Sequence, residues 1–153
     1  MQSLELKIPP PIVTALFAVA MWMLSSYPPL LPLPALTRVS IALVILVIGI
    51  GFSMAGMASF SRAKTTVNPL KPESTTSLVS SGVYRFTRNP MYVGMLLVLV
   101  AWGVYLSSVW TWIGPLALWL YLTQFQIKPE ERVLTKMFGA EFEAYKAKVR
   151  RWL

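Results

Sequence analysis

The chain has 153 residues, of which 56% are hydrophobic and 13% charged, and its formal net charge is +8. This balance is far from that of a soluble domain and predicts an integral membrane protein. Cys, His and Asp are absent, which excludes disulfides, thiolate sites and histidine bases and leads us to expect no metal site.

Three stretches without charge predict four transmembrane helices. No charged residue occurs in 8–37, in 39–61 or in 89–127. Each of the first two stretches can hold one span of about 20 residues, and the third is long enough for two crossings of a ~30 Å hydrocarbon core. The predicted spans are 11–27, 38–60, 90–107 and 109–127.

The first and the last two spans have alternatives. Lys7 before an apolar run that contains Ala18-Val19-Ala20 is similar to a signal peptide, but the run continues through Leu24 and favours a span. We place the turn between the last two spans at Ser107-Ser108. Gly114-Pro115 is the stronger local break, although a proline can also lie inside a transmembrane helix. Both versions predict a helical hairpin.

The positions of the cations indicate the orientation. Of fourteen Lys and Arg residues, five lie in the segment before the third span and seven lie from Lys128 onward. With four spans these segments share one side with Lys7 and leave Arg38 on the other, and the positive-inside rule makes the cation-rich side cytoplasmic. We therefore expect a multi-pass membrane protein with both termini in the cytoplasm. Its basic residues are expected to contact anionic lipid headgroups and not nucleic acid.

Two cytoplasmic segments complete the expected all-α fold of one membrane domain. The loop 61–89 is longer than a connector needs, and such loops are usually functional or disordered. Over 129–151, apolar residues recur at three- and four-residue steps between Lys and Arg. This pattern predicts an amphipathic helix on the membrane surface, with a bend or break at Gly139.

Two expected helix starts on the cytoplasmic side carry the candidate chemistry. In the first, Asn89 suits the N-cap and Pro90 the first helical position, so that free amide donors beside Arg88 can bind an anion. In the second, which is Lys128-Pro129-Glu130-Glu131-Arg132, two carboxylates fill the first turn. Capping, the helix dipole and an arginine that reaches lipid headgroups explain the same residues without any ligand.

Four elements follow one another between about residues 65 and 150: an Arg-x-Pro-x-Tyr-x-Gly motif at Arg88, an apolar hairpin, paired glutamates, and an amphipathic tail with Phe138-Gly139. In this combination the chain resembles the isoprenylcysteine carboxyl methyltransferase and phospholipid methyltransferase superfamily. That superfamily commonly has histidine where this chain has Asn89. A role for imidazole as proton acceptor is thereby lost, whereas hydrogen bonding is kept.

The resemblance implies S-adenosylmethionine as the cofactor, bound near the cytoplasmic ends of the last two spans. It implies catalytic roles for Arg88, Glu130 and Glu131. Arginine suits the cofactor's carboxylate, glutamates suit its amino and hydroxyl groups, and aromatic faces suit its sulfonium. The expected cofactor contacts are Tyr84, Arg88, Asn89, Pro90, Tyr92, Gly94, Glu130 and Glu131.

The methyl acceptor stays open at this point. The resemblance implies a lipophilic or membrane-delivered molecule: an isoprenylcysteine-type carboxylate, a lipid amine or a small thiol. A carboxylate needs no base, whereas a thiol or an ammonium group needs one, for which Glu130, Glu131 or a tyrosine is available. The alternatives are an NADPH-dependent membrane reductase of the sterol-reductase type, for which the chain is short, and a non-catalytic membrane module.

Overall fold

The computed structural model describes residues 5–63 and 77–153, and this part of the chain is all-α. The α-helices are α1 (Pro10–Leu24), α2 (Ala35–Arg62), α3 (Pro90–Leu106), α4 (Ile113–Tyr121) and α5 (Lys128–Lys148). Two short 3₁₀ helices, η3 (Gly82–Arg85) and η4 (Val109–Trp112), and a π-helix, η5 (Leu122–Ile127), complete the described elements. The all-α prediction is therefore confirmed for the described residues.

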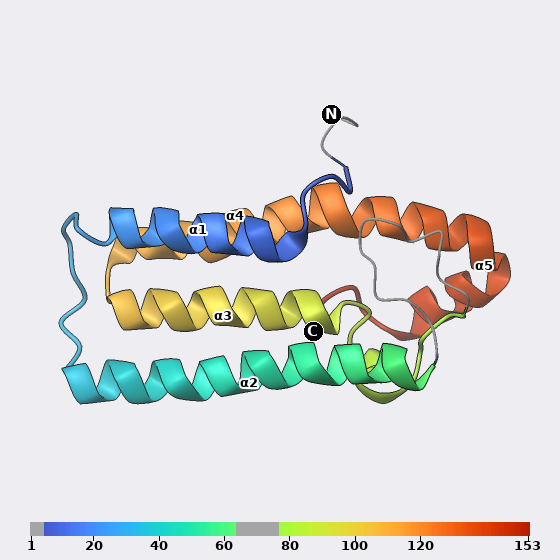
Figure 1. Ribbon diagram of the computed structural model, residues 1–153, viewed down its shortest axis with the longest axis horizontal. Helices are drawn as coiled ribbons and strands as arrows, with labels where there is room; N and C mark the ends of the chain where they lie inside the picture. Colours follow the sequence, from blue (N-terminus) through green and yellow to red (C-terminus); the bar gives the residue numbers. More distant parts are fainter. Residues whose placement is uncertain (1–4, 64–76) are drawn as a thin grey trace.

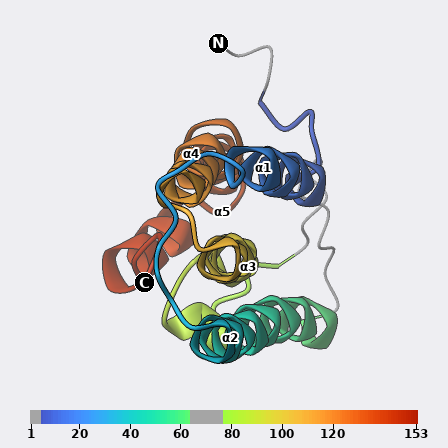
Figure 2. The ribbon, with the colours of Figure 1, turned by 90° about the vertical axis from the view of Figure 1, so that its left-hand side faces the viewer.

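Helix α3 lies at the centre of the bundle. The end-on view in Figure 2 places α1 and α4 on one side of α3 and α2 on the other, and Figure 1 shows the four helices lying side by side. Fully buried Leu99 of α3 packs with Leu118 and Leu122, and with Met21 of α1, in one apolar core. The first residues of α3 are therefore held by neighbours on both sides.

Helix α2 approaches α3 closely because glycines leave room for the backbones. A Cβ added at Gly94 would lie 2.1 Å from Ser53 Oγ and 2.5 Å from the carbonyl oxygen of Gly49. The rest of α2 is largely exposed and apolar, and among the described helices it has the length and composition to cross a membrane. Helices α1 and α3 are apolar but shorter. Four spans therefore remain a prediction.

The helix ends differ from the predicted span limits by a few residues. Helix α2 begins at Ala35 and runs to Arg62, and α1 ends at Leu24. The chain turns at Ser107, which ends α3 in the left-handed conformation with a φ of 54°. Gly114-Pro115 lies inside α4 and does not interrupt the helix.

Helix α5 begins at Lys128 as predicted, but this start is not a free helix end, because the helix runs on from α4 through the π-helix into α5. Ile127 and Lys128 both have right-handed helical dihedral angles. Pro129 cannot donate a hydrogen bond to the carbonyl group of Phe125, and the backbone N–H of Leu6 bonds to that carbonyl at 3.1 Å. The two glutamates therefore do not face a free helix end, and the dipole explanation for them fails.

The helix predicted over 129–151, with a bend or break at Gly139, is bent at that glycine and ends three residues early, at Lys148. Gly139 has a φ of 48° and a ψ of −121°, so α5 bends there as expected and its second half folds back (Figure 1). The helix ends at Lys148, and the chain after it returns to the start of α3, where the N–H of Arg88 donates to the carbonyl of Arg150 at 3.0 Å. Within the predicted loop 61–89, residues 64–76 lie outside the described part.

Candidate functional site

Arg88 and Glu131, predicted as site residues, bind each other at the end of the bundle where α3 begins. Arg88 Nη2 donates to Glu131 Oε1 at 2.6 Å, and its Nη1 donates to the carbonyl oxygen of Val149 at the same distance. A second guanidinium, that of Arg151, donates to both oxygens of Glu131 at 3.0 and 2.6 Å. One carboxylate of α5 thus joins the segment just before α3 to the segment after α5.

The environment keeps Glu131 ionised. Burial by itself raises the pKa of this carboxyl group, but hydrogen bonds from Arg151 and Arg88, together with their charges, outweigh it and lower the pKa. The side chains of Arg88 and Glu131 are only 10% and 14% exposed. Water therefore screens the Arg88–Glu131 pair weakly, and the pair can contribute to stability as well as to binding.

The neighbouring Glu130 has different partners. The hydroxyl group of Tyr92 donates to Glu130 Oε1 at 2.5 Å, and Gln126 Nε2 donates to the same oxygen at 3.0 Å. Burial raises the pKa of Glu130 to about 7, although these two hydrogen bonds act in the opposite direction. Glu130 can therefore change its charge near neutral pH, which Glu131 cannot.

Asn89 stands before Pro90 as predicted, but its side chain does not cap α3. No side-chain capping bond is present at Asn89; its Nδ2 instead donates to the carbonyl of Arg151 at 2.9 Å. The hydroxyl of Thr87 donates to the same carbonyl at 3.2 Å. The capping prediction is wrong because the chain after α5 returns across this helix start and supplies an acceptor for the amide.

Tyr84 and Gly94 take structural positions. The ring of Tyr84 meets Phe60 edge-on at 5.4 Å, and its carbonyl accepts a bond of 2.7 Å from the hydroxyl of Tyr145. Burial, and then the neighbouring Tyr145 and Glu130, raise the pKa of Tyr84, so that its hydroxyl stays neutral. Gly94 lies against α2, where it allows the close contact described above.

Sequence reasoning missed two residues of this cluster, Gln126 and Arg151. Gln126 stands four residues before Glu130, a spacing that places both side chains on one helix face and could have indicated the pair. Arg151 lies 20 residues after Glu131 in a cationic tail. No local pattern distinguishes it from its neighbours Lys148 and Arg150.

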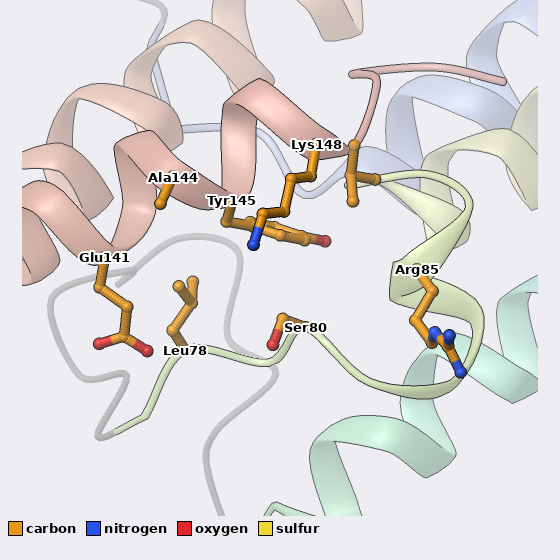
Figure 3. A pocket seen from close by; sticks show the side chains of 8 residues that line it. Leu78, Ser80, Arg85, Glu141, Ala144, Tyr145 and Lys148 are labelled. Carbon is orange, nitrogen blue, oxygen red and sulfur yellow. The ribbon is translucent and has the colours of Figure 1, made fainter.

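A shallow pocket of about 460 Å³ lies beside this cluster, between η3 with its preceding residues and the second half of α5. Figure 3 shows Tyr145 and Lys148 on one side and Leu78 and Ser80 on the other. Arg85 also lines it. None of the predicted site residues lines the pocket, so the cluster and the pocket are neighbouring but separate features.

Comparison with known proteins connects this cluster with one family. Residues 37–141 match the family described as phospholipid methyltransferase. An uncharacterized protein of Haemophilus influenzae is 46% identical over 63 residues, which are 41% of this chain and all of that protein. No solved structure matches.

Two further relatives carry an enzyme name. A probable protein-S-isoprenylcysteine O-methyltransferase of Oryza sativa subsp. indica is 32% identical over 110 residues, 71% of this chain and 57% of that protein. The protein-S-isoprenylcysteine O-methyltransferase of Schizosaccharomyces pombe is 36% identical over 73 residues, 47% of this chain and 30% of that protein. The chain thus spans little more than half of the rice relative. It belongs to the phospholipid methyltransferase family, in the superfamily that includes the isoprenylcysteine carboxyl methyltransferases.

Proposed function

We propose that this protein is a membrane methyltransferase that uses S-adenosylmethionine and methylates a lipophilic acceptor. The observation that carries the proposal is the meeting of Arg88, Tyr92, Glu130 and Glu131 at one end of the bundle, within the segment that matches the family. Tyr92 comes from α3, the two glutamates come from α5, and Arg88 comes from the segment just before α3. Tyr92 and Glu130 are 38 positions apart, and Arg88 and Glu131 are 43 apart. The names of the relatives support methyl transfer as the reaction.

The chemistry of the cluster fits S-adenosylmethionine, which carries a carboxylate, an amino group and a sulfonium. Arg88 has one buried donor, Nε, without a partner among the described residues, and it suits a carboxylate. The carboxylate of Glu130 suits the amino group or the sulfonium, and the ring of Tyr92 offers a face to a cation. When bound, the cofactor supplies a methyl group on sulfur that is already a good leaving group.

For methyl transfer of this kind, the protein mainly has to align the methyl donor with the acceptor and exclude water. Donor and acceptor must be held in line at roughly 3–3.5 Å. No enzyme nucleophile is required, which agrees with a chain without Cys or His. For a thiol or an ammonium acceptor, Glu130 can accept the proton, because burial places its pKa at about 7, close to the operating pH.

A lipophilic acceptor is supported by the apolar surface beside the site. Helix α2 exposes large apolar side chains along its length, among them Leu36, Val47 and Met54 at 80%, 66% and 60%. Such a surface suits lipid, from which an acceptor can reach the end of the bundle. Arg62 ends α2, Arg85 ends η3 and Lys128 begins α5, and these element ends lie where α3 begins (Figure 1). Arg38, in the first turn of α2, lies over the ring of Tyr105 near the other end of α3. This distribution supports a cytoplasmic site.

Direct ligand binding tests this function. We expect purified protein in detergent to bind S-adenosylmethionine and S-adenosylhomocysteine and not NADPH, as measured by isothermal titration calorimetry. Arg88→Lys should weaken binding about tenfold, because lysine keeps the charge but loses the planar guanidinium. Binding of NADPH alone would identify a reductase, and binding of none of the three would leave a non-catalytic membrane module.

The affinity for S-adenosylmethionine should rise with pH. Glu130, with a pKa of about 7, is mostly protonated at pH 6 and mostly ionised at pH 8, and only the carboxylate attracts the cationic part of the cofactor. Its ionised fraction grows about tenfold over this interval, and the association constant should follow.

The cofactor's own amino group also titrates near pH 8. Glu130→Gln is the control, because it keeps the ligand's titration and removes that of the protein. Calorimetry from pH 6 to 8 should give a steeper rise for the parent than for the variant. Equal slopes would show that Glu130 does not face the cofactor.

A further inference from the structure

Two buried N–H donors around the cluster lack a hydrogen-bond partner among the described residues. They are Nε of Arg88 and the indole Nε1 of Trp152. Both groups are donors only, so neither can be satisfied by another N–H. A buried donor without an acceptor costs free energy, and native proteins keep few of them. Two such donors at one end of the bundle indicate that a ligand with a hydrogen-bond acceptor binds there.

Trp152 lies beside both parts of the candidate site. The backbone just before it is bonded to the start of α3, through the carbonyls of Arg150 and Arg151. Its side chain packs against the apolar cluster that includes Tyr92 and Ile127. The segment 149–153 thus crosses the helix start and brings an indole ring to the region where Arg88 and Tyr92 lie.

The charges of the cluster favour an anion as the missing acceptor. Arg88 and Arg151 bring two positive charges to the single carboxylate of Glu131. Among these three side chains one positive charge remains, since Glu130 bonds to Tyr92 and Gln126 and not to an arginine. A ligand carboxylate beside Arg88 would balance that charge while offering lone pairs to both unpaired donors.

We propose that Trp152 belongs to the cofactor site and that its indole N–H and Arg88 Nε donate hydrogen bonds to the carboxylate of S-adenosylmethionine. This inference rests on the proposed function, since it names a contact of the same cofactor. It adds a residue outside the Arg-x-Pro-x-Tyr-x-Gly motif and the paired glutamates, and it assigns the segment 149–153 a role in binding. A packing role alone would leave the N–H unused.

Trp152→Phe separates the two roles, because phenylalanine keeps an aromatic ring and removes the N–H. The matched control is Trp102→Phe, since the indole of Trp102 already donates to the carbonyl of Ala18 at 3.0 Å. The probes are S-adenosylmethionine and its decarboxylated analogue, which lacks only the carboxylate. Dissociation constants are measured by calorimetry on the full chain in detergent.

We expect Trp152→Phe to bind S-adenosylmethionine about five- to twentyfold more weakly and the decarboxylated analogue within twofold of the parent. Trp102→Phe should bind both ligands like the parent. Equal affinity of Trp152→Phe and parent for S-adenosylmethionine, or an equal loss for both ligands, would overturn the inference and leave the proposed function standing.

The parent protein provides a test that does not depend on the folding of any variant. It should bind S-adenosylmethionine at least tenfold more tightly than the decarboxylated analogue, because the two donors find their acceptor only in the former. Similar affinities for the two ligands would refute the assigned contact. If the parent binds neither ligand, the proposed function itself fails.

Discussion

Replacing Glu131 by glutamine is expected to destabilise the protein by roughly 2–3 kcal/mol, because it leaves two guanidinium groups without their shared carboxylate. Arg88 is 10% exposed and cannot recover full hydration. Glutamine keeps one acceptor oxygen, so the loss should fall below that for complete removal of a buried partner. The carboxylate joins the segment just before α3 to the segment after α5, so its loss should weaken the attachment of both segments.

The measurement is the midpoint of thermal or denaturant unfolding in detergent at pH 8. Glu143→Gln is the matched control: Glu143 is also in α5 and also pairs with a cation, Lys146, but its side chain is 52% exposed. This control should leave the midpoint almost unchanged, because solvent screens an exposed ion pair. Equal effects of the two substitutions would contradict a structural role for the Arg88–Glu131–Arg151 cluster.

Replacing Glu130 by glutamine should have the opposite effects, weaker cofactor binding without a loss of stability. Glu130→Gln is expected to weaken S-adenosylmethionine binding by roughly ten- to a hundredfold, because a charge-assisted contact is lost. Stability at pH 8 should be unchanged or raised. The folded-state pKa of Glu130, about 7, lies above the ordinary value of 4.5 for a glutamate, so the folded protein holds this proton more tightly. The stability that this proton contributes is complete below pH 4.5 and is lost as the pH rises through 7.

Glutamine is neutral and can still accept the bond from Tyr92, so it avoids the cost of an ionised side chain in this buried position. Calorimetry measures the affinity for the cofactor, and thermal unfolding at pH 6 and pH 8 measures the change in stability. The gain in stability from Glu130→Gln should be larger at pH 8. A variant that unfolds early at both values, or binds the cofactor like the parent, would show that Glu130 has a purely structural role.

The all-α fold and the identity of most cluster residues could be predicted from the sequence. Long stretches without charge are a local property, so α1, α2 and α3 lie close to three of the predicted spans. Gly139 bends α5 because glycine adopts a positive φ at little cost. The family resemblance singled out Arg88, Tyr92 and the two glutamates from short motifs, and the structure brings these side chains together in pairs.

The tertiary structure alone decided which partner each group takes. Glu130 and Glu131 are neighbours in sequence, yet one bonds to Tyr92 and the other to Arg88 and Arg151. Adjacent positions on a helix point in directions about 100° apart. The start of α3 and the segment after α5 determine what each glutamate meets in its direction. The predicted capping role of Asn89 is also wrong because of a distant partner. Its side-chain amide donates to the carbonyl of Arg151, which is 62 positions away in the sequence.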